Sequence, residues 1–154
     1  MLNVKAVAAY IVDRYKTEYG TDIDQMKLHK LLYFAQREAL VQTGSPLFAD
    51  RFEARKYGPV MPCVRYAFDG HNYGESLGKE EIEEYAPVFD VVFEKYASIS
   101  SWDLSMLSHS ETSWRKARNR KNGDNTHEEL MRTEDIALDA NHVRERRELY
   151  SRFH

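Results

Sequence analysis

The histidines of this 154-residue chain are the first candidates for chemistry, because histidine serves both as a metal ligand and as a general base. The run from His127 to Met131 begins like the HExxH motif of zinc proteases, but Met131 stands where the second histidine belongs. The single cysteine, Cys63, has no second thiol with which to share a zinc ion. The spacing of these ligand types therefore predicts no metal site, and we expect no cofactor.

Nucleophilic catalysis would use Ser108, His109 and Glu111, which have the residue types of a catalytic triad. Triad members converge in space from separate parts of a chain, and close neighbours in sequence rarely do so. The sequence also lacks a glycine-rich phosphate-binding loop. We therefore expect a protein that is not an enzyme, and a catalytic site around His109 is the third hypothesis.

A basic segment follows Trp114 and contains Arg115, Lys116, Arg118, Arg120 and Lys121. Such a segment can contact phosphates or an acidic protein surface, or it can be a solvated helix end. The net charge of −3 argues against a protein whose whole surface grips nucleic acid. A nucleic-acid-binding regulator that uses residues 115–121 is the alternative function, and Arg115 and Arg118 are also candidate contacts to a protein partner.

The composition is that of a globular domain, with 42% hydrophobic and 12% aromatic residues. One cysteine permits no intrachain disulfide, which indicates a reducing compartment, and we expect a cytoplasmic location. No stretch approaches the roughly 20 apolar residues that span a bilayer, so no membrane association is expected. The length fits a single domain over residues 1–154.

Helical spacing of apolar residues places the elements that carry these side chains. It predicts a helix over 3–19, capped by Asn3 and ended by Gly20, and a core helix over 25–43, capped by Asp22 or Asp24 and ended by Gly44. The core helix has the clearest pattern: Leu28, Leu31, Leu32, Ala35 and Ala39. Residues 46–57 lose the pattern and predict an irregular passage with room for a short strand.

Further along, Pro59 or Pro62 begins a helix that ends at Gly70, and Pro87 breaks the next apolar stretch so that a helix starts there. Ser101 is expected to cap a short helix, another helix begins near Glu111, and residues 118–126 form a polar turn. Thr126 and Glu129 have the spacing of a capping box, and Thr133 starts the last helix. The predicted fold class is mainly α, a compact single-domain helical bundle with an irregular or short extended segment around residues 46–58.

Four runs of the sequence together resemble one known family. Residues 27–36, KLHKLLYFAQ, resemble the KLQKLLYYAQ signature of the SocA-like antitoxin domain, also called the Panacea domain. Residues 44–48 (GSPLF) and 52–60 (FEARKYGPV) resemble its next two runs, and residues 104–117 resemble its LS-x-x-TH-x-E-x-x-W-x-x-A run. The residues that carry the resemblance include Leu28, Leu31, Tyr33, Gln36, Gly58, Pro59, His109 and Trp114. Arg55 and Ser108 depart from the pattern, since the family usually has Trp and Thr there.

The resemblance implies a function in bacterial or phage-borne toxin–antitoxin modules. Members of the family neutralise a cognate toxin protein by direct binding, and some deliver the toxin to an ATP-dependent protease as adaptors. The turn before Gly58-Pro59 is a candidate contact surface, because proline restrains the backbone and presents Lys56 and Tyr57 at low entropic cost. Tyrosine is also the residue type that interfaces favour, and the chain has ten.

His109 is expected to join the family-like runs into one unit. We expect Ser108 or Ser110 to cap a helix that begins near Glu111, with His109 at its positive N-terminal end. That position would disfavour the imidazolium and keep His109 neutral. We hypothesise that its ring bonds to the chain near Tyr57.

Overall fold

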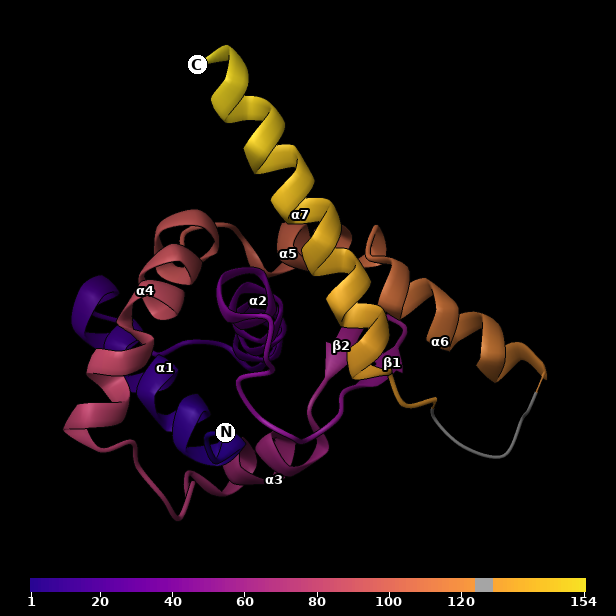
Figure 1. Ribbon diagram of the computed structural model, residues 1–154. Coiled ribbons are helices and arrows are strands. Elements are labelled where there is room, and N and C mark those ends of the chain that lie inside the picture. Colours follow the sequence, from indigo (N-terminus) through magenta and orange to yellow (C-terminus); the bar gives the residue numbers. More distant parts are fainter. Residues whose placement is uncertain (124–128) are drawn as a thin grey trace.

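The computed structural model describes residues 1–123 and 129–154, without the side chains of residues 121–123. Within these ranges the chain forms seven helices and a small two-stranded sheet, which confirms the mainly α fold class (Figure 1). The elements are α1 (Val4–Tyr19), α2 (Gln25–Thr43), β1 (Glu53–Arg55), β2 (Gly58–Val60), α3 (Pro62–Gly70), α4 (Lys79–Tyr96), α5 (Ser101–His109), α6 (Thr112–Gly123) and α7 (Thr133–Phe153).

The two N-terminal helices begin and end where the sequence predicts. The side chains of Asn3 and Asp24 cap α1 and α2 by accepting hydrogen bonds from backbone N–H groups of the first turn. Gly20 and Gly44 follow the last helical residues with φ of 74° and 76°, the left-handed conformation that glycine adopts most readily.

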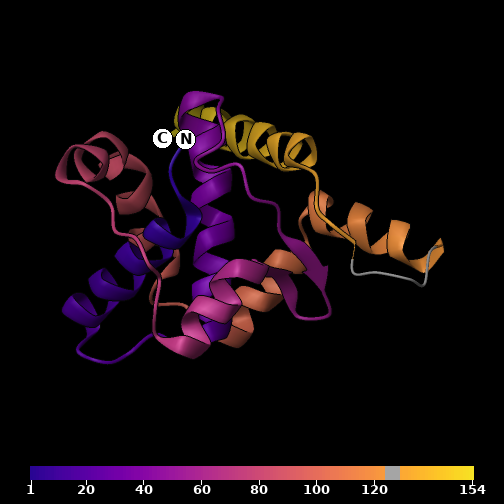
Figure 2. The same cartoon turned by 90° about the horizontal axis from the view of Figure 1, so that it is seen from below.

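The second helix passes through the middle of the molecule and contacts α1, α3, α4, α5, α7 and β2 (Figures 1 and 2). The predicted apolar stripe is fully buried: Leu28, Leu31, Leu32 and Ala35. Burial extends around the whole helix from residue 27 to residue 40 and includes the charged side chains of Lys30, Arg37 and Glu38. Because water cannot solvate these groups, their partners within the protein decide whether their burial is tolerated.

The segment before the sheet is fixed by a side chain of α2. The amide of Gln36 is fully buried, and its Oε1 accepts a hydrogen bond from the backbone N–H of Leu47 at 2.7 Å. Its Nε2 donates to the carbonyl oxygen of Phe48 at 2.9 Å. Two of the family-like runs are thus joined by one residue that satisfies backbone groups of an irregular passage.

Strands β1 and β2 form an antiparallel hairpin whose turn is Lys56-Tyr57. Arg55 pairs with Gly58 at the end of the hairpin. The outer edge of β1 bonds to residues 129–131, since the Ala54 N–H donates to the Glu129 carbonyl at 2.9 Å. The hairpin is therefore hydrogen-bonded along both edges of its first strand, which fixes the position of its turn.

The expected break at Pro87 is wrong, because α4 runs unbroken from Lys79 to Tyr96 with Pro87 inside it. Proline removes one backbone hydrogen bond and leaves a carbonyl oxygen free one turn earlier, on Glu83. Both residues are exposed, so water can solvate that carbonyl. The apolar face continues across the proline through buried Val88 and Phe89, and its packing maintains the helix.

Two helix starts are settled by the structure. Pro62, not Pro59, is the first residue of α3, and Pro59 lies in β2. The short helix α5 is capped by Ser100 rather than by Ser101, since the Ser100 Oγ accepts a hydrogen bond from the Asp103 N–H at 3.1 Å. A serine at either position can cap a helix, so the sequence alone leaves the choice open by one residue.

The predicted polar turn over 118–126 is wrong for residues 118–123, where α6 continues to Gly123. Arginine and lysine are good helix formers, and Arg120 is anchored by hydrogen bonds to Glu129 and to the Leu130 carbonyl. Thr126 of the expected capping box lies outside the described residues. Thr133 is the first residue of α7, as predicted.

The last helix packs on α2 and α6 as far as Arg147, which pairs with Glu38 at 2.7 Å, and its last turns extend away from the other elements (Figure 1). Ile136, Ala140 and Val143 are buried, whereas Tyr150 near the end of the helix is 66% exposed. Among the described helices, none combines the length and apolar character needed to cross a membrane.

Candidate functional site

The hairpin and the α5–α6 corner are bonded to each other through three side chains. The Ser105 Oγ donates a hydrogen bond to the carbonyl oxygen of Tyr57 at 2.5 Å. The indole Nε1 of Trp114 donates to the Arg55 carbonyl at 2.9 Å, and Arg118 donates to the Ala54 carbonyl at 3.1 Å. The Ala54 carbonyl points away from the strand pairing and the Tyr57 carbonyl lies in the turn, so the three bonds fix the hairpin against the helices.

Gly58 is required where the hairpin approaches α2 and α5. Its φ of +113° lies in a region that residues with a Cβ rarely adopt. A Cβ at this position would lie 2.4 Å from the Ser108 Oγ and 2.7 Å from the Lys30 Cε. The next residue, Pro59, offers its carbonyl oxygen to the Lys30 Nζ at 3.1 Å. The Gly-Pro pair thus permits a close approach and provides an acceptor for a buried cation.

His109 lies at the C-terminal end of α5 rather than at the N-terminal end of α6, so the expected effect of the helix dipole does not apply. Its ring stacks on Trp114 with the ring centroids 4.3 Å apart. Burial lowers the pKa of His109, while a polar contact with the Lys56 backbone acts in the opposite direction. The ring therefore lies beside the hairpin turn, and the hypothesised bond from the ring to the chain near Tyr57 stays a prediction.

The N-terminus of α6 is capped by a residue from α7. The two carboxylate oxygens of Asp139 accept hydrogen bonds from the N–H groups of Thr112 and Ser113 at 2.8 and 3.0 Å. Ser108 and Ser110 were expected to provide this cap, but their hydroxyls donate within α5 to carbonyls three residues earlier. A carboxylate at this position also interacts favourably with the helix dipole.

The three triad-type residues are each engaged elsewhere. The Ser108 hydroxyl donates to the Ser105 carbonyl at 2.7 Å, and the His109 ring stacks on Trp114. The Glu111 carboxylate forms a buried ion pair with Arg37, whose guanidinium also donates to the Tyr96 hydroxyl at 2.5 Å. These contacts give the residues structural roles. Among the described residues, no group of three or more His, Cys, Asp or Glu side chains is placed to hold a metal ion.

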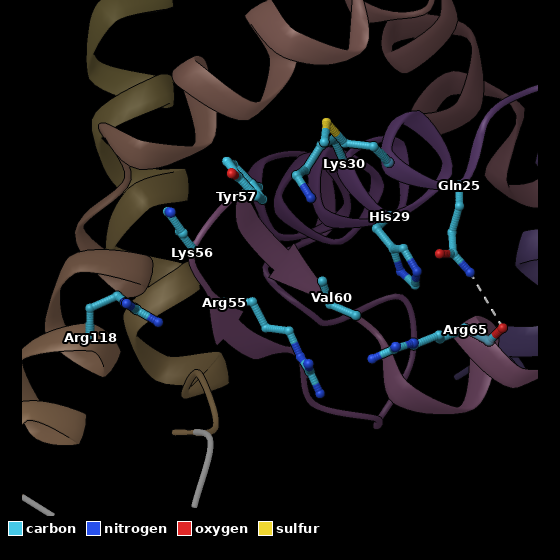
Figure 3. Close-up of a pocket in the computed structure, with 10 residues that line it drawn as sticks. Gln25, His29, Lys30, Arg55, Lys56, Tyr57, Val60, Arg65 and Arg118 are labelled. Atoms are coloured by element: carbon cyan, nitrogen blue, oxygen red, sulfur yellow. Dashed lines mark hydrogen bonds between the residues drawn. The ribbon is translucent and has the colours of Figure 1, made fainter. Parts of the chain in front are cut away.

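A cavity of about 390 Å³ opens between α2, the hairpin, α3 and α6 (Figure 3). It is lined by Gln25, Met26, His29, Lys30, Arg55, Lys56, Tyr57, Val60, Arg65 and Arg118. Five of these side chains carry a positive charge, His29 can also be protonated, and none of the described lining residues is acidic. The cavity is therefore strongly cationic although the chain as a whole is acidic.

Two neighbouring residues of α2 form the most buried part of the cavity wall. His29 is 3% exposed and Lys30 is 1% exposed. Burial lowers the pKa of His29 to about 3, assisted by the charges of Lys30 and Arg65. Burial also lowers the pKa of Lys30 to about 8, which still leaves its ammonium mostly charged at neutral pH. The wall thus combines a neutral imidazole with a buried cation.

The residues expected to contact a partner are only partly brought together. Lys56, Tyr57 and Arg118 line the cavity. Arg115 does not, because its guanidinium turns back to the His109 carbonyl at 3.1 Å. The sequence reasoning missed His29 and Arg65. The sequence contained a signal for His29. A polar residue next to Leu28 in a helix that is buried on all sides must pack against another part of the protein.

Most residues of this site lie in the part of the chain that is similar to a known protein family. A sequence model described as "Antitoxin SocA-like, Panacea domain" matches residues 28–115, which is more than half of the chain. The chain belongs to the SocA-like antitoxin family. The residues that match the family include seven that line the cavity: His29, Lys30, Arg55, Lys56, Tyr57, Val60 and Arg65.

A named protein is similar to part of this chain. Antitoxin SocA of Caulobacter vibrioides is 39% identical over 70 residues. That segment covers 46% of this chain and 37% of the relative. Most of the relative's length therefore lies outside the match. No solved structure matches the chain.

Proposed function

We propose that this chain is an antitoxin that neutralises a partner protein toxin by binding it directly. Membership of the family supports the antitoxin assignment. One structural observation favours a binding surface at the hairpin turn: the rings of Tyr57 and Trp102 lie side by side, 6.0 Å apart, and are 45% and 56% exposed. Aromatic side chains of this kind are enriched among the residues that dominate binding energy.

The surroundings of the aromatic pair suit a protein interface. Met106, which lies one helical turn after Trp102 on α5, is also 40% exposed. The cationic cavity lies beside Tyr57, so apolar contacts are combined with positive charge that can guide an acidic partner. The hydrogen bond from Ser105 holds the Tyr57 backbone in place before binding, which reduces the entropy lost on association.

The contacts of α6 weigh against the nucleic-acid alternative. Arg118 and Arg120 donate to the backbone of the hairpin and of residue 130. Lys116 and Arg120 lie 3.5 and 3.6 Å from the carboxylate of Asp135, and Arg115 bonds to the His109 carbonyl. A phosphate backbone would have to compete with these partners, so a protein surface is the better candidate.

Delivery of the toxin to an ATP-dependent protease is a further part of the proposal. An adaptor needs a second contact surface, separate from the one that binds its cargo. The end of α7 offers such a surface, because it extends from the body of the molecule with Leu149, Tyr150 and Phe153 exposed (Figure 1).

The proposal is tested by co-expressing the chain with the protein encoded by the adjacent gene. We expect growth arrest by that protein to be relieved and the two proteins to co-purify. Replacing Tyr57 and Trp102 together by alanine should abolish both effects. The matched control is Tyr66→Ala, which removes a tyrosine of α3 that is 77% exposed and should change neither. Co-purification that survives the double substitution would place the interface elsewhere.

A further inference from the structure

The cationic cavity has the form of a small-molecule site. Ligand cavities are concave, of a few hundred Å³, largely apolar, and carry a small number of fixed polar groups. Here Met26, Tyr57 and Val60 supply apolar wall, and the cavity has a volume of about 390 Å³. The polar groups are almost all hydrogen-bond donors, which selects for an anion.

One of these donors is buried and has no partner. The His29 Nδ1 accepts a hydrogen bond from the Met61 N–H at 3.1 Å, so the proton of the neutral ring lies on Nε2. The Nε2 atom is buried and has no hydrogen-bond partner among the described residues. Figure 3 shows the ring directed into the space bordered by Val60 and Arg65. An unsatisfied buried donor is costly, and a ligand oxygen would satisfy it.

A buried ammonium lies next to this imidazole. The Lys30 Nζ donates one hydrogen bond, to the Pro59 carbonyl at 3.1 Å, and an ammonium has three donors. The pKa of about 8 shows that the surrounding protein stabilises its charge poorly, even with the carboxylate of Asp24 near. An anionic ligand would supply the missing counter-charge.

The number of unpaired cations in the cavity indicates which class of anion fits it. Arg55 is paired with Glu53 at 2.8 Å, and Arg118 bonds to the hairpin. Lys56 and Arg65 form no ion pair with any described residue, so with Lys30 they leave about three positive charges. A phosphate monoester carries about −1.5 to −2 charges at pH 7, whereas a carboxylate carries one. The phosphate compensates the cavity more fully.

We propose that this cavity is a receptor for a phosphate group carried by a small organic molecule. The phosphate oxygens accept hydrogen bonds from the His29 Nε2 and the Lys30 Nζ, and the cations at the mouth, Lys56 and Arg65, attract the dianion. The organic part lies against Met26, Val60 and Tyr57. Because Lys56 and Tyr57 also belong to the proposed toxin surface, an occupied cavity would change that surface. The receptor itself does not depend on toxin binding.

The test is calorimetric titration of the purified chain at pH 7 with phenyl phosphate, inorganic phosphate and phenol. We expect saturable binding of phenyl phosphate, weaker binding of inorganic phosphate and none of phenol. Lys30→Met should weaken phenyl phosphate binding about tenfold or more, as expected for the loss of a charge-assisted hydrogen bond. Lys79→Met is the matched control, because Lys79 is exposed on α4 and outside the cavity, and it should bind like the wild type.

A second variant tests the imidazole separately. His29→Asn keeps a side-chain acceptor for the Met61 N–H and removes the Nε2 donor, and it should weaken binding without loss of the folded state by circular dichroism. The absence of saturable phenyl phosphate binding would overturn the proposal, as would equal binding by the wild type and both cavity variants. If no phosphate binds and Lys30→Met instead abolishes toxin capture, the cavity receives an acidic side chain of the toxin, and the small-molecule proposal is wrong.

Discussion

The indole Nε1 of Trp114 donates a hydrogen bond to the carbonyl oxygen of Arg55 at 2.9 Å, although 59 residues separate them. Arg55 belongs to the run before the hairpin turn, and Trp114 belongs to the first turns of α6. This bond connects two of the family-like runs. The two runs therefore form one structural unit, which presents the Lys56-Tyr57 turn at the surface.

Trp114→Phe tests the importance of that connection. The ring still fills the space beside His109, but the Arg55 carbonyl loses the indole donor and keeps only its strand partner Gly58. We expect the free energy of unfolding to fall by about 1 kcal/mol, the net contribution of one intramolecular hydrogen bond. Urea denaturation measures this change. A loss below about 0.5 kcal/mol, typical of a surface substitution, would show that the bond does not hold the unit together.

Gly58→Ala tests the close approach of the hairpin to α2 and α5. The added methyl group would meet Ser108 and Lys30 in addition to the cost of a positive φ. Backbone strain of this kind costs about 1–3 kcal/mol, and the contacts add to it. The matched control is Gly74→Ala, where φ is +72° and no atom lies within 4 Å of the added Cβ. Equal losses of unfolding free energy for the two variants would contradict the importance of the approach.

Lys30→Met is expected to stabilise the fold at pH 7. Burial lowers the pKa of Lys30 from 10.5 to about 8, which corresponds to about 3 kcal/mol at about 1.4 kcal/mol per pKa unit. The lost bond to the Pro59 carbonyl offsets about 1 kcal/mol, so the net gain is about 2 kcal/mol. A buried charge that destabilises the fold is typical of a binding site.

The stabilising effect of Lys30→Met should depend on pH. The unfolded chain binds the Lys30 proton more tightly than the folded chain, so the penalty is complete below about pH 8 and disappears toward pH 10.5. The stability advantage of Lys30→Met should therefore shrink as the pH rises through this window. Thermal unfolding of both proteins between pH 7 and pH 10.5 measures the difference. A constant or growing advantage would show that Lys30 is not buried as a charge.

The sequence predicted the helices that depend on local pattern and failed where tertiary contacts decide. The caps Asn3 and Asp24 and the burial of Leu31 follow from residue type and spacing, and the structure confirms them. Pro87 was misjudged because packing of the buried face of α4 outweighs one lost hydrogen bond. Asp139 could not be assigned as the cap of α6, since it comes from another helix 27 residues away.

The same distinction applies to the candidate site. Lys56 and Tyr57 were predictable because a Gly-Pro pair marks a turn within one short run. His29, Lys30 and Arg65 come from α2 and α3, and only the packing of α3 and the hairpin on α2 brings them together. Arg115 was predicted together with Arg118 but does not line the cavity. Neighbouring residues of a helix point in different directions, and the sequence does not show which of them faces the hairpin.

The central claim is that the hairpin turn binds the toxin, and the affinity of the purified pair tests it most directly. Titration of the toxin with the wild type, Tyr57→Ala and Tyr66→Ala in one calorimeter gives three dissociation constants. We predict a loss of about 30-fold or more for Tyr57→Ala, corresponding to a dominant interface residue of about 2 kcal/mol, and no change for Tyr66→Ala. Equal affinities for all three proteins, with Tyr57→Ala folded by circular dichroism, would contradict the account.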